Sequence, residues 1–470
     1  MSGITATSAT RVSDLPRAHT GALWITASTV LTSAANYAFS LALIHVLAPA
    51  DYVAYAAVQS LLLILGSGCM AAIPWAIAAH VAADPTPGAA RQALSFGLGA
   101  ATVQGLGFAA AAYLIVAPSS GHTLAASTAA AAFALSIITA PLGLLQGRQQ
   151  MSRMAALRVI ETVVRLGVAA GLLLTVAADA NLAVAGFTVG SLTLFAMSLH
   201  AVRDALPLTR APSQAVRALL GRSTRLGLVQ IAVASLGVID TIVVTYTALG
   251  TTDRAAYQIA ALLGRVPLYL GTALALAYFP ALAQARTEAE IRTGLSSAVR
   301  LLTILGLPGA ALLATVPAPV LTLLAANRAD LVASVLPATS TCGIAVAAST
   351  VILTGLQARG RYRTALIALG PIVLVQPLAL LFFGNTGDLH RYALAAAALA
   401  VTSVAVASFA SRTWRPWGAL GRRDLLTVAT PVALAAAAGL LPALWPVAAL
   451  AALGGAVLAL RHPDRTASSL

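Results

Sequence analysis

Long apolar runs, each about the length of a membrane-spanning helix, recur along the chain from residue 21 to residue 461. They are continuous stretches of Ala, Leu and Val, whereas a β-barrel needs short alternating segments. Because a spanning helix needs roughly 20 apolar residues, the pattern predicts an all-α polytopic membrane protein with about fourteen transmembrane helices. The expected spans are 21–47, 52–80, 91–117, 124–146, 155–178, 181–203, 226–249, 254–282, 297–317, 332–356, 364–385, 391–411, 424–442 and 444–461.

The charged residues set the orientation of these spans. Only 9% of the chain is charged, and all 28 basic residues are Arg. In a soluble chain the pI near 10.9 would indicate nucleic acid, but here 22 of the 28 Arg fall in the loops and tails of one side. The positive-inside rule therefore places both termini in the cytoplasm and the protein in the cytoplasmic (inner) membrane, with the excess charge facing anionic lipids. We expect membrane lipids, and no nucleic acid, as partners.

One long loop separates the first six spans from the next six. Residues 203–225 carry five Arg against one Asp, and Val216, Leu219 and Leu220 recur there at helical spacing. Both an interfacial amphipathic helix and a solvated basic linker fit this pattern. The predicted organisation is a cytoplasmic tail (1–20), an N-lobe (21–203), a basic linker (204–225), a C-lobe (226–411), an appended helix pair (412–461) and a cytoplasmic tail (462–470).

A weak internal sequence repeat supports two related lobes. Asp51 and Tyr55 follow the first span, and Asp253 and Tyr257 follow the seventh, in each case four residues apart on an expected external turn. Since each lobe has an even number of spans, the two would be parallel repeats about an axis along the membrane normal. The appended pair has no charged residue between its ends, so we expect it to pack outside the transport core.

The fifth span carries charges that a lipid-facing helix would exclude. Steps of three and seven residues place Arg158, Glu161 and Arg165 within about 60° of one another on a helix. Ionisable groups inside a membrane cost on the order of 2.5–3.5 kcal/mol each and mark a bundle interior or a substrate path. We therefore expect this face to meet protein or a ligand.

The second lobe places a comparable charge near mid-membrane. Arg265 lies about 17 Å along the eighth span at 1.5 Å per residue, and Asp240 lies in the seventh span. The intramembrane set is then three positive and two negative, and its net charge of +1 favours an anionic ligand. Arg makes bidentate bonds to phosphate, although sulfate or carboxylate would also fit. The candidate pyrophosphate ligands are Arg165, Arg265 and Arg158; the alternative is a self-contained ion-pair network that only joins helices.

Polar side chains form a second kind of candidate. In the first span Thr29, Thr32, Ser33, Asn36 and Ser40 make one stripe. Hydroxyl and amide groups suit sugar hydroxyls, but small polar residues also let membrane helices pack closely. The candidate sugar ligands are Thr29, Ser33, Asn36 and Gln258.

The sequence shows no sign of an enzyme. It contains no metal-ligand cluster, no phosphate-binding glycine loop and no nucleophile paired with a base, so neither a cofactor nor a metal is expected. A membrane-embedded glycosyltransferase is disfavoured because the external loops are nearly bare of acidic and basic groups. Asp240 and Glu161 are the candidates for coupling transport to H⁺ or Na⁺, and the membrane potential is another possible driving force.

Four passages resemble the polysaccharide-export branch of the multidrug/oligosaccharidyl-lipid/polysaccharide (MOP) exporter superfamily, the lipid-linked oligosaccharide flippases. Their order and spacing along residues 20–411 carry the resemblance. The passages are Leu47-Ala-Pro-Ala-Asp-Tyr-Val-Ala-Tyr55, Leu145-Gln-Gly-Arg-Gln-Gln150 before the charged helix, the region from Asp240 through Tyr257 and Arg265 to Phe279-Pro-Ala-Leu282, and Leu356-Gln-Ala-Arg-Gly-Arg361.

The resemblance implies two lobes in a V that alternate between inward and outward opening and move an undecaprenyl-pyrophosphate-linked oligosaccharide to the outer leaflet. It also implies a cationic cavity, a monomer, and a polysaccharide polymerase and glycosyltransferases as neighbours. The fourteen-helix count is similar to the lipid II flippase branch. The first two spans contain no Arg, however, so we expect a surface-polysaccharide repeat unit rather than lipid II. A drug or metabolite antiporter of the same superfamily is the alternative, and the net charge of +1 opposes it.

Overall fold

The computed structural model describes residues 15–84, 86–209, 213–412 and 422–461. These residues are almost entirely helical and contain no strand, which confirms the all-α membrane fold. Both predicted tails lie largely outside the described residues. The helices are α1 (Leu15–Val46), α2 (Pro49–Ala83), α3 (Pro87–Ile137), α4 (Thr139–Gly147), α5 (Met151–Thr175), α6 (Ala180–Ala201), α7 (Ser213–Val243), α8 (Thr251–Gly264), α9 (Val266–Gln284), α10 (Glu288–Ala314), α11 (Ala318–Ala325), α12 (Ala329–Ala358), α13 (Tyr362–Gly384), α14 (Leu389–Ala410), α15 (Arg422–Ala438) and α16 (Trp445–Arg461).

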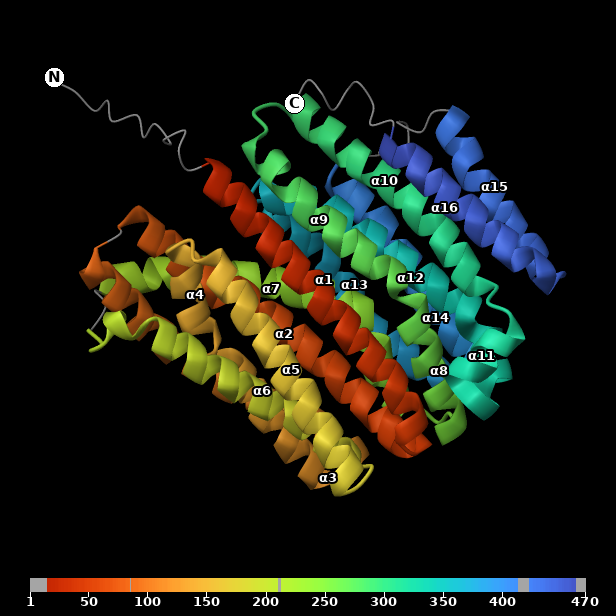
Figure 1. Cartoon of the computed structure of the whole chain (residues 1–470), viewed down its shortest axis with the longest axis horizontal. Helices are drawn as coiled ribbons and strands as arrows, with labels where there is room; N and C mark the ends of the chain where they lie inside the picture. The colour runs from red at the N-terminus through yellow and green to blue at the C-terminus, as the bar shows by residue number, and fades with distance from the viewer. Residues whose placement is uncertain (1–14, 85, 210–212, 413–421, 462–470) are drawn as a thin grey trace. The chain divides into compact units, whose positions relative to one another are not determined.

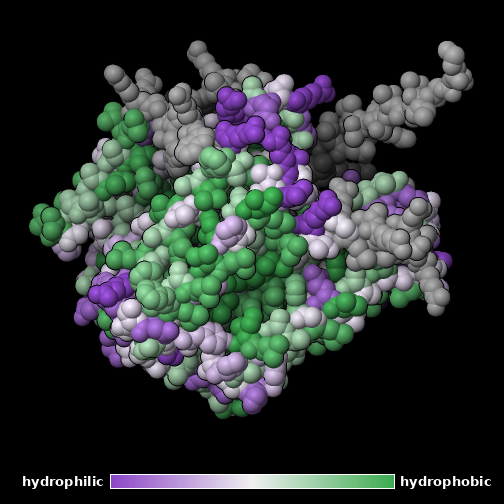
Figure 2. All heavy atoms as spheres, turned by 180° about the vertical axis from the view of Figure 1, so that it is seen from behind, coloured by the Kyte–Doolittle hydropathy of each residue, from purple (hydrophilic) through white to green (hydrophobic). Residues whose placement is uncertain are grey.

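The helices are suited to a bilayer. Within the described residues, ten helical segments are long and apolar enough to cross a membrane, and α15 and α16 add two shorter apolar helices. Large apolar side chains remain exposed along one face of α13, where Ile367, Leu374, Leu378 and Phe382 are all at least 65% accessible. Figure 2 shows apolar residues over much of the face that it presents, with hydrophilic residues at its edges and in a band that runs in from the top. Helix α5 is not among the ten, because it carries the three charges noted above.

The chain divides into two compact units. The first contains residues 1–42, 69–117 and 121–224, and the second contains 43–68, 118–120 and 225–470. The core of the first is built from α2, α3, α4, α5 and α6, with Ile77, Leu94, Leu142 and Leu157 among its buried residues. Helices α5 and α6 lie side by side (Figure 1). The lobe boundaries inferred from the sequence stay a prediction.

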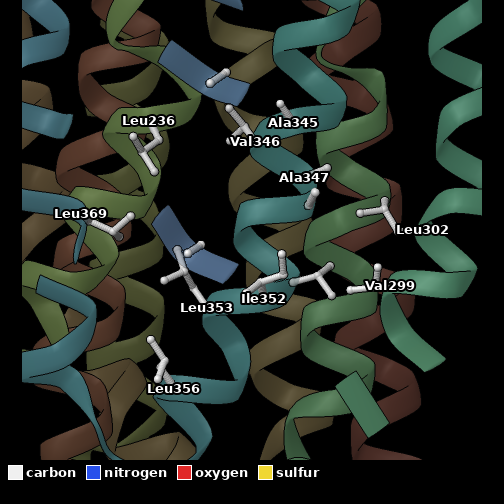
Figure 3. Close-up of a cluster of buried hydrophobic side chains, with 14 of the residues drawn as sticks. Leu236, Val299, Leu302, Ala345, Val346, Ala347, Ile352, Leu353, Leu356 and Leu369 are labelled. Atoms are coloured by element: carbon white, nitrogen blue, oxygen red, sulfur yellow. The ribbon is translucent and has the colours of Figure 1, made fainter. Parts of the chain in front are cut away.

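Helix α12 is the centre of the second unit. Its apolar residues pack against α7, α10, α13 and α14, and Val346, Ile352 and Leu353 are nearly inaccessible. Figure 3 shows these side chains converging with Leu236 of α7 and Val299 of α10. From Cys342 to Leu356 the helix is buried nearly all round, as expected of a core segment that is apolar on every face.

The appended helices α15 and α16 pack against α10 (Figure 1). Arg300 of α10 forms two hydrogen bonds of 2.8 Å to the carboxylate of Asp424 in α15. Trp445 at the start of α16 donates its indole N–H to the carbonyl of Leu312 at 3.1 Å. A bidentate Arg–carboxylate pair has a fixed geometry, so the pair of helices is held in register on α10.

Several element boundaries differ from those expected. The span 254–282 is two helices, because Pro267 cannot continue the hydrogen bonding of α8 and instead occupies the first turn of α9. The spans 91–117 and 124–146 are joined through α3, whose backbone is non-helical at Gly121 (φ 83°), where a residue with a side chain would be strained. Helix α11 was not expected. From Ser213 onward the basic linker is helical and continuous with the seventh span. The two Asp–Tyr repeats begin helices α2 and α8 rather than forming turns.

Candidate functional site

Helix α6 lies unusually close to the charged part of α5. Gly186 and Gly190 face it, and a Cβ at Gly190 would come within 2.7 Å of the Arg165 Cβ, while one at Gly186 would come within 2.5 Å of the Arg165 carbonyl oxygen. Small residues four apart permit such close backbone approach in membranes. The glycine pair therefore fixes the position from which the Arg165 side chain extends.

The guanidinium of Arg165 is surrounded by groups from three helices. Its Nη2 donates to Asn36 Oδ1 of α1 at 2.7 Å, and its central carbon lies 4.8 Å from the ring centroid of Phe187 in α6. Its Nε lies 3.4 Å from Glu161 Oε1 on α5. The Nε–H is buried but makes no hydrogen bond within the described residues. The aromatic ring and the amide orient the cation, and one of its donors is left over.

Glu161 and Arg158 complete this group on α5. The carboxylate of Glu161 accepts a 3.3 Å hydrogen bond from Thr162 Oγ1. Arg158 donates to the thioether sulfur of Met70 in α2 at 3.8 Å, which is a weak acceptor. Within the described residues Arg158 has no ion-pair partner. The two arginines and one glutamate leave a net charge of +1, and we call the group Arg158, Glu161, Arg165 and Asn36 the α5 cluster.

The second unit also holds a largely buried arginine, and a carboxylate neutralises it. Arg265, at the junction of α8 and α9, forms an ion pair with Asp240 Oδ1 of α7. The other oxygen of Asp240 accepts from Tyr257 Oη at 2.6 Å. Tyr392 of α14 donates to the Asp240 carbonyl at 2.5 Å and stacks edge to face on Tyr257 at 4.8 Å. The Asp240 side chain is 4% exposed, so this group, which we call the α7–α9 pair, is closed and neutral.

Glycines also bring a helix against this pair. Gly343 of α12 lies against the break between α8 and α9, where a Cβ would overlap the Gly264 carbonyl oxygen and lie 3.2 Å from the Arg265 Cα. Thr339 of α12 donates its hydroxyl to the Ala260 carbonyl at 2.9 Å. This hydrogen bond joins α12 to α8 four residues before the end of α8.

The amide of Gln258 is used in helix packing. Its Nε2 donates to the carbonyls of Val53 in α2 at 3.1 Å and of Thr241 in α7 at 3.0 Å. The residue is 1% exposed, and its Oε1 makes no hydrogen bond within the described residues. These bonds place Gln258 between two helices of the second unit, so we leave it out of the proposed sugar contacts.

The polar stripe of α1 reaches the α5 cluster through Asn36. Thr29 and Ser33 are partly exposed on the same helix. The Ser40 hydroxyl donates to the Asn36 carbonyl at 2.9 Å, and that of Thr32 donates to the Thr29 carbonyl at 3.1 Å. Asn36, a predicted sugar ligand, provides an acceptor for Arg165; its contact with sugar stays a prediction.

Sequence reasoning missed three residues that shape the α5 cluster. Phe187, Gly186 and Gly190 all lie on α6, which carries no charge to attract attention. The Gly-x-x-x-Gly spacing was the available signal. In the part of the chain that the structure describes, no three His, Cys, Asp or Glu residues are placed to hold a metal ion.

The fold is that of known membrane transporters. A lipid II flippase, MurJ, in an inward closed conformation matches with a TM-score of 0.69 over 92% of this chain and 99% of its own, at 12% identity. An inward-facing multidrug resistance MATE family transporter of the MOP superfamily matches with a TM-score of 0.65 over 82% of this chain and 95% of its own, at 16% identity.

A MOP superfamily transporter from Pyrococcus furiosus matches with a TM-score of 0.59 over 84% of this chain and 94% of its own, at 14% identity. The binding pocket of that transporter is reported to have reverse polarity. No protein-family model matches the sequence, and no curated protein matches it. The chain therefore has the fold of the MOP exporter superfamily, as its sequence predicted.

Proposed function

We propose that this protein is a flippase that moves a polyprenyl-pyrophosphate-linked oligosaccharide, a repeat unit of a surface polysaccharide, from the inner to the outer leaflet by alternating access. The observation that carries the proposal is the α5 cluster, where two arginines face one carboxylate and a buried Nε–H of Arg165 makes no hydrogen bond within the described residues. The likeness to a lipid II flippase supports the class of cargo.

A pyrophosphate suits the α5 cluster chemically. Arg presents a planar fork of donors that matches two phosphate oxygens, and the face of Arg165 is already oriented by Phe187. Arg158 lies seven residues earlier, about 10 Å along the helix at 1.5 Å per residue. Two cations at this spacing can engage the cargo in turn as it moves along α5. In this proposal Arg265 takes no part in binding because Asp240 already neutralises it.

The sugar would meet the polar face of α1. Thr29 and Ser33 are partly exposed there and follow the line that leads to Asn36. Hydroxyl groups donate and accept hydrogen bonds, so they tolerate different sugar orientations. The prenyl tail would stay in lipid, as the resemblance implies.

The membrane potential favours the loaded step. A diphosphate diester carries about two negative charges, and outward movement with the interior negative gains about 2.3 kcal/mol per charge per 100 mV. Resetting the empty carrier needs a further step, for which Glu161 or Asp240 is the candidate to bind H⁺ or Na⁺. Neutralising each residue in turn tests this step; flipping whose ion dependence is unchanged in both variants removes it.

An antiporter of cationic drugs is the second candidate, because a MATE transporter shares the fold. Such a function calls for an acidic site. Among the intramembrane charges of the described residues, Asp240 is paired with Arg265 and Glu161 lies beside Arg165, while Arg158 has no ion-pair partner. The surplus of positive charge therefore favours the anionic cargo.

Transport in proteoliposomes distinguishes these functions. The full-length protein is reconstituted with a fluorescent prenyl-pyrophosphate sugar, its neutral prenyl-alcohol analogue or a cationic dye. We expect translocation of the pyrophosphate lipid alone, and loss of at least about tenfold in Arg165→Ala and a smaller loss in Arg158→Ala, with ten-fold corresponding to 1.4 kcal/mol. Arg153→Ala, an exposed position on the same helix, serves as the matched control. Export of the dye without the lipid would establish the antiporter instead.

A further inference from the structure

The Arg165 guanidinium already has an anion beside it in the absence of cargo. Glu161 lies one helical turn before Arg165, and its Oε1 is 3.4 Å from the Arg165 Nε. The alignment is too poor for a hydrogen bond, so the buried Nε–H keeps an unused donor. Glu161 thus compensates the charge of Arg165 without filling its hydrogen-bonding capacity.

The Glu161 carboxylate is itself loosely held. Its Oε2 accepts from the hydroxyl of Thr162 at 3.3 Å, and the same hydroxyl donates to the Arg158 carbonyl at 3.0 Å. A hydroxyl has one proton to donate, so these two bonds compete. Both Glu161 and Arg165 side chains retain 13% exposure. The carboxylate can therefore rotate away from Arg165 without breaking a strong bond.

We propose that Glu161 is a resident counter-anion of Arg165, which the cargo pyrophosphate displaces on binding and which takes its place again on release. The inference rests on the proposed function and assigns Glu161 the role of a positioning residue that sets the exchange of cargo. Pyrophosphate oxygens fill the free Nε–H and replace the neutral Asn36 oxygen, whereas Glu161 offers only an unaligned oxygen. The pyrophosphate binds Arg165 more strongly than Glu161 does, because it makes bidentate, charge-assisted hydrogen bonds.

The exchange of anions also keeps the positive charge of Arg165 balanced by an anion throughout the transport cycle. A guanidinium inside a membrane is costly when no anion lies beside it, and Glu161 supplies that anion whenever the site is empty. The return of Glu161 helps to expel the pyrophosphate. Without the carboxylate, the cargo binds more tightly and leaves more slowly.

Two variants of the full-length protein test the exchange in opposite directions. The measurements are the Kd for farnesyl pyrophosphate in detergent and the maximal rate of flipping of the fluorescent prenyl-pyrophosphate sugar. Glu161→Gln keeps the shape and removes the charge, so Kd falls about tenfold, equivalent to 1.4 kcal/mol, while the maximal rate also falls. Asn36→Asp replaces the amide oxygen that accepts from Arg165 with a carboxylate oxygen. This anion competes with the cargo for Arg165, so Kd rises.

The controls separate this role from a structural one. Glu161→Asp retains the carboxylate and keeps a Kd near that of the wild type. Glu288→Gln makes the same change at a side chain that is 64% exposed in the other unit and leaves both measurements unchanged. Tighter binding together with slower turnover supports the inference, because a merely structural defect weakens binding.

The result that overturns the inference is a Glu161→Gln protein that binds farnesyl pyrophosphate no more tightly than the wild type, or an Asn36→Asp protein that binds it no more weakly. If the wild type binds and flips the lipid in that case, the proposed function stands and only the role of Glu161 is lost. A wild type that neither binds nor flips the lipid overturns both.

Discussion

The α5 cluster and the α7–α9 pair place an arginine in similar surroundings and satisfy it differently. Each arginine keeps 13% of its side chain exposed and sits where a glycine admits a neighbouring helix. Arg265 is neutralised by Asp240, whose other oxygen is held by Tyr257. Arg165 has a neutral amide, an unaligned carboxylate and a spare donor. An ion pair of the first kind joins helices, whereas one of the second kind can accept a ligand.

The largest expected effect is the loss of stability when the α7–α9 pair is broken. Asp240→Asn leaves the Arg265 guanidinium buried without its counter-charge, so the free energy of unfolding falls by about 3–5 kcal/mol. Glu161→Gln loses far less, because that pair is not hydrogen-bonded. Thermal unfolding in detergent measures both. Equal losses in the two variants would show that the two ion pairs stabilise the fold equally. The double variant Asp240→Asn with Arg265→Gln removes both charges and should recover part of the stability.

The glycine contacts give the next largest effect. Gly343→Ala forces a Cβ onto a backbone oxygen, which cannot move aside as a side chain can, so we expect a loss of about 1–3 kcal/mol. Gly190→Ala meets the Arg165 Cβ and Cα at 2.7 and 3.2 Å, so it displaces Arg165 and reduces flipping at a smaller loss of stability.

The matched controls for both substitutions are glycines with open space. A Cβ at Gly167 of α5 or at Gly309 of α10 would have no neighbouring atom within 4 Å. Alanine at either should leave unfolding and flipping unchanged or slightly improve stability, since glycine is unfavourable inside a helix. A Gly190→Ala protein with wild-type flipping would show that the position of Arg165 does not matter.

The smallest expected effect lies outside the membrane spans, at an exposed ion pair in the first unit. Arg148 donates to both oxygens of Asp204 at 2.9 and 2.6 Å, and these hydrogen bonds lower the pKa of the Asp204 carboxyl. The stabilisation is therefore present above the pKa of an unfolded Asp and is lost as the pH falls through the lower folded value.

Because Asp204 is 64% exposed, solvent screening limits this contribution to at most about 1 kcal/mol. The measurement compares the thermal stability of the wild type and Asp204→Asn between neutral and acidic pH. The difference between them should vanish at the acidic end. A difference that stays constant with pH would mean that the Asp204 charge does not stabilise the fold.

The sequence predicted the helices well because bilayer length and apolar composition are local properties. It located the break between 117 and 124 but placed no break at Arg265, although Pro267 follows it. Proline is tolerated inside α2, α10, α12 and α13. Whether a proline ends a helix depends on the packing around it, here the close approach of Gly343 of α12 to the break between α8 and α9. That packing comes from residues far away in the sequence.

The sequence predicted which charged residues form the site, but not which of them are paired with each other. Helical spacing placed Arg158, Glu161 and Arg165 on one face, and their net charge was readable at once. The pairing of Arg265 with Asp240 depends on contacts between α7, α8 and α14. The unused donor of Arg165 depends on the approach of α6 and α1. The contacts of Arg165 join residues more than 20 and more than 100 positions apart, and Gly-x-x-x-Gly is the one local pattern that points to them.

The most direct test of the account removes each ion pair as a unit. Flipping of the fluorescent prenyl-pyrophosphate sugar is measured in proteoliposomes for Arg165→Gln with Glu161→Gln and for Arg265→Gln with Asp240→Asn, after each has been shown to be folded. We expect the first double variant to lose flipping and the second to retain most of it. Retained flipping in the first, with loss in the second, would contradict the placement of the anion site on α5.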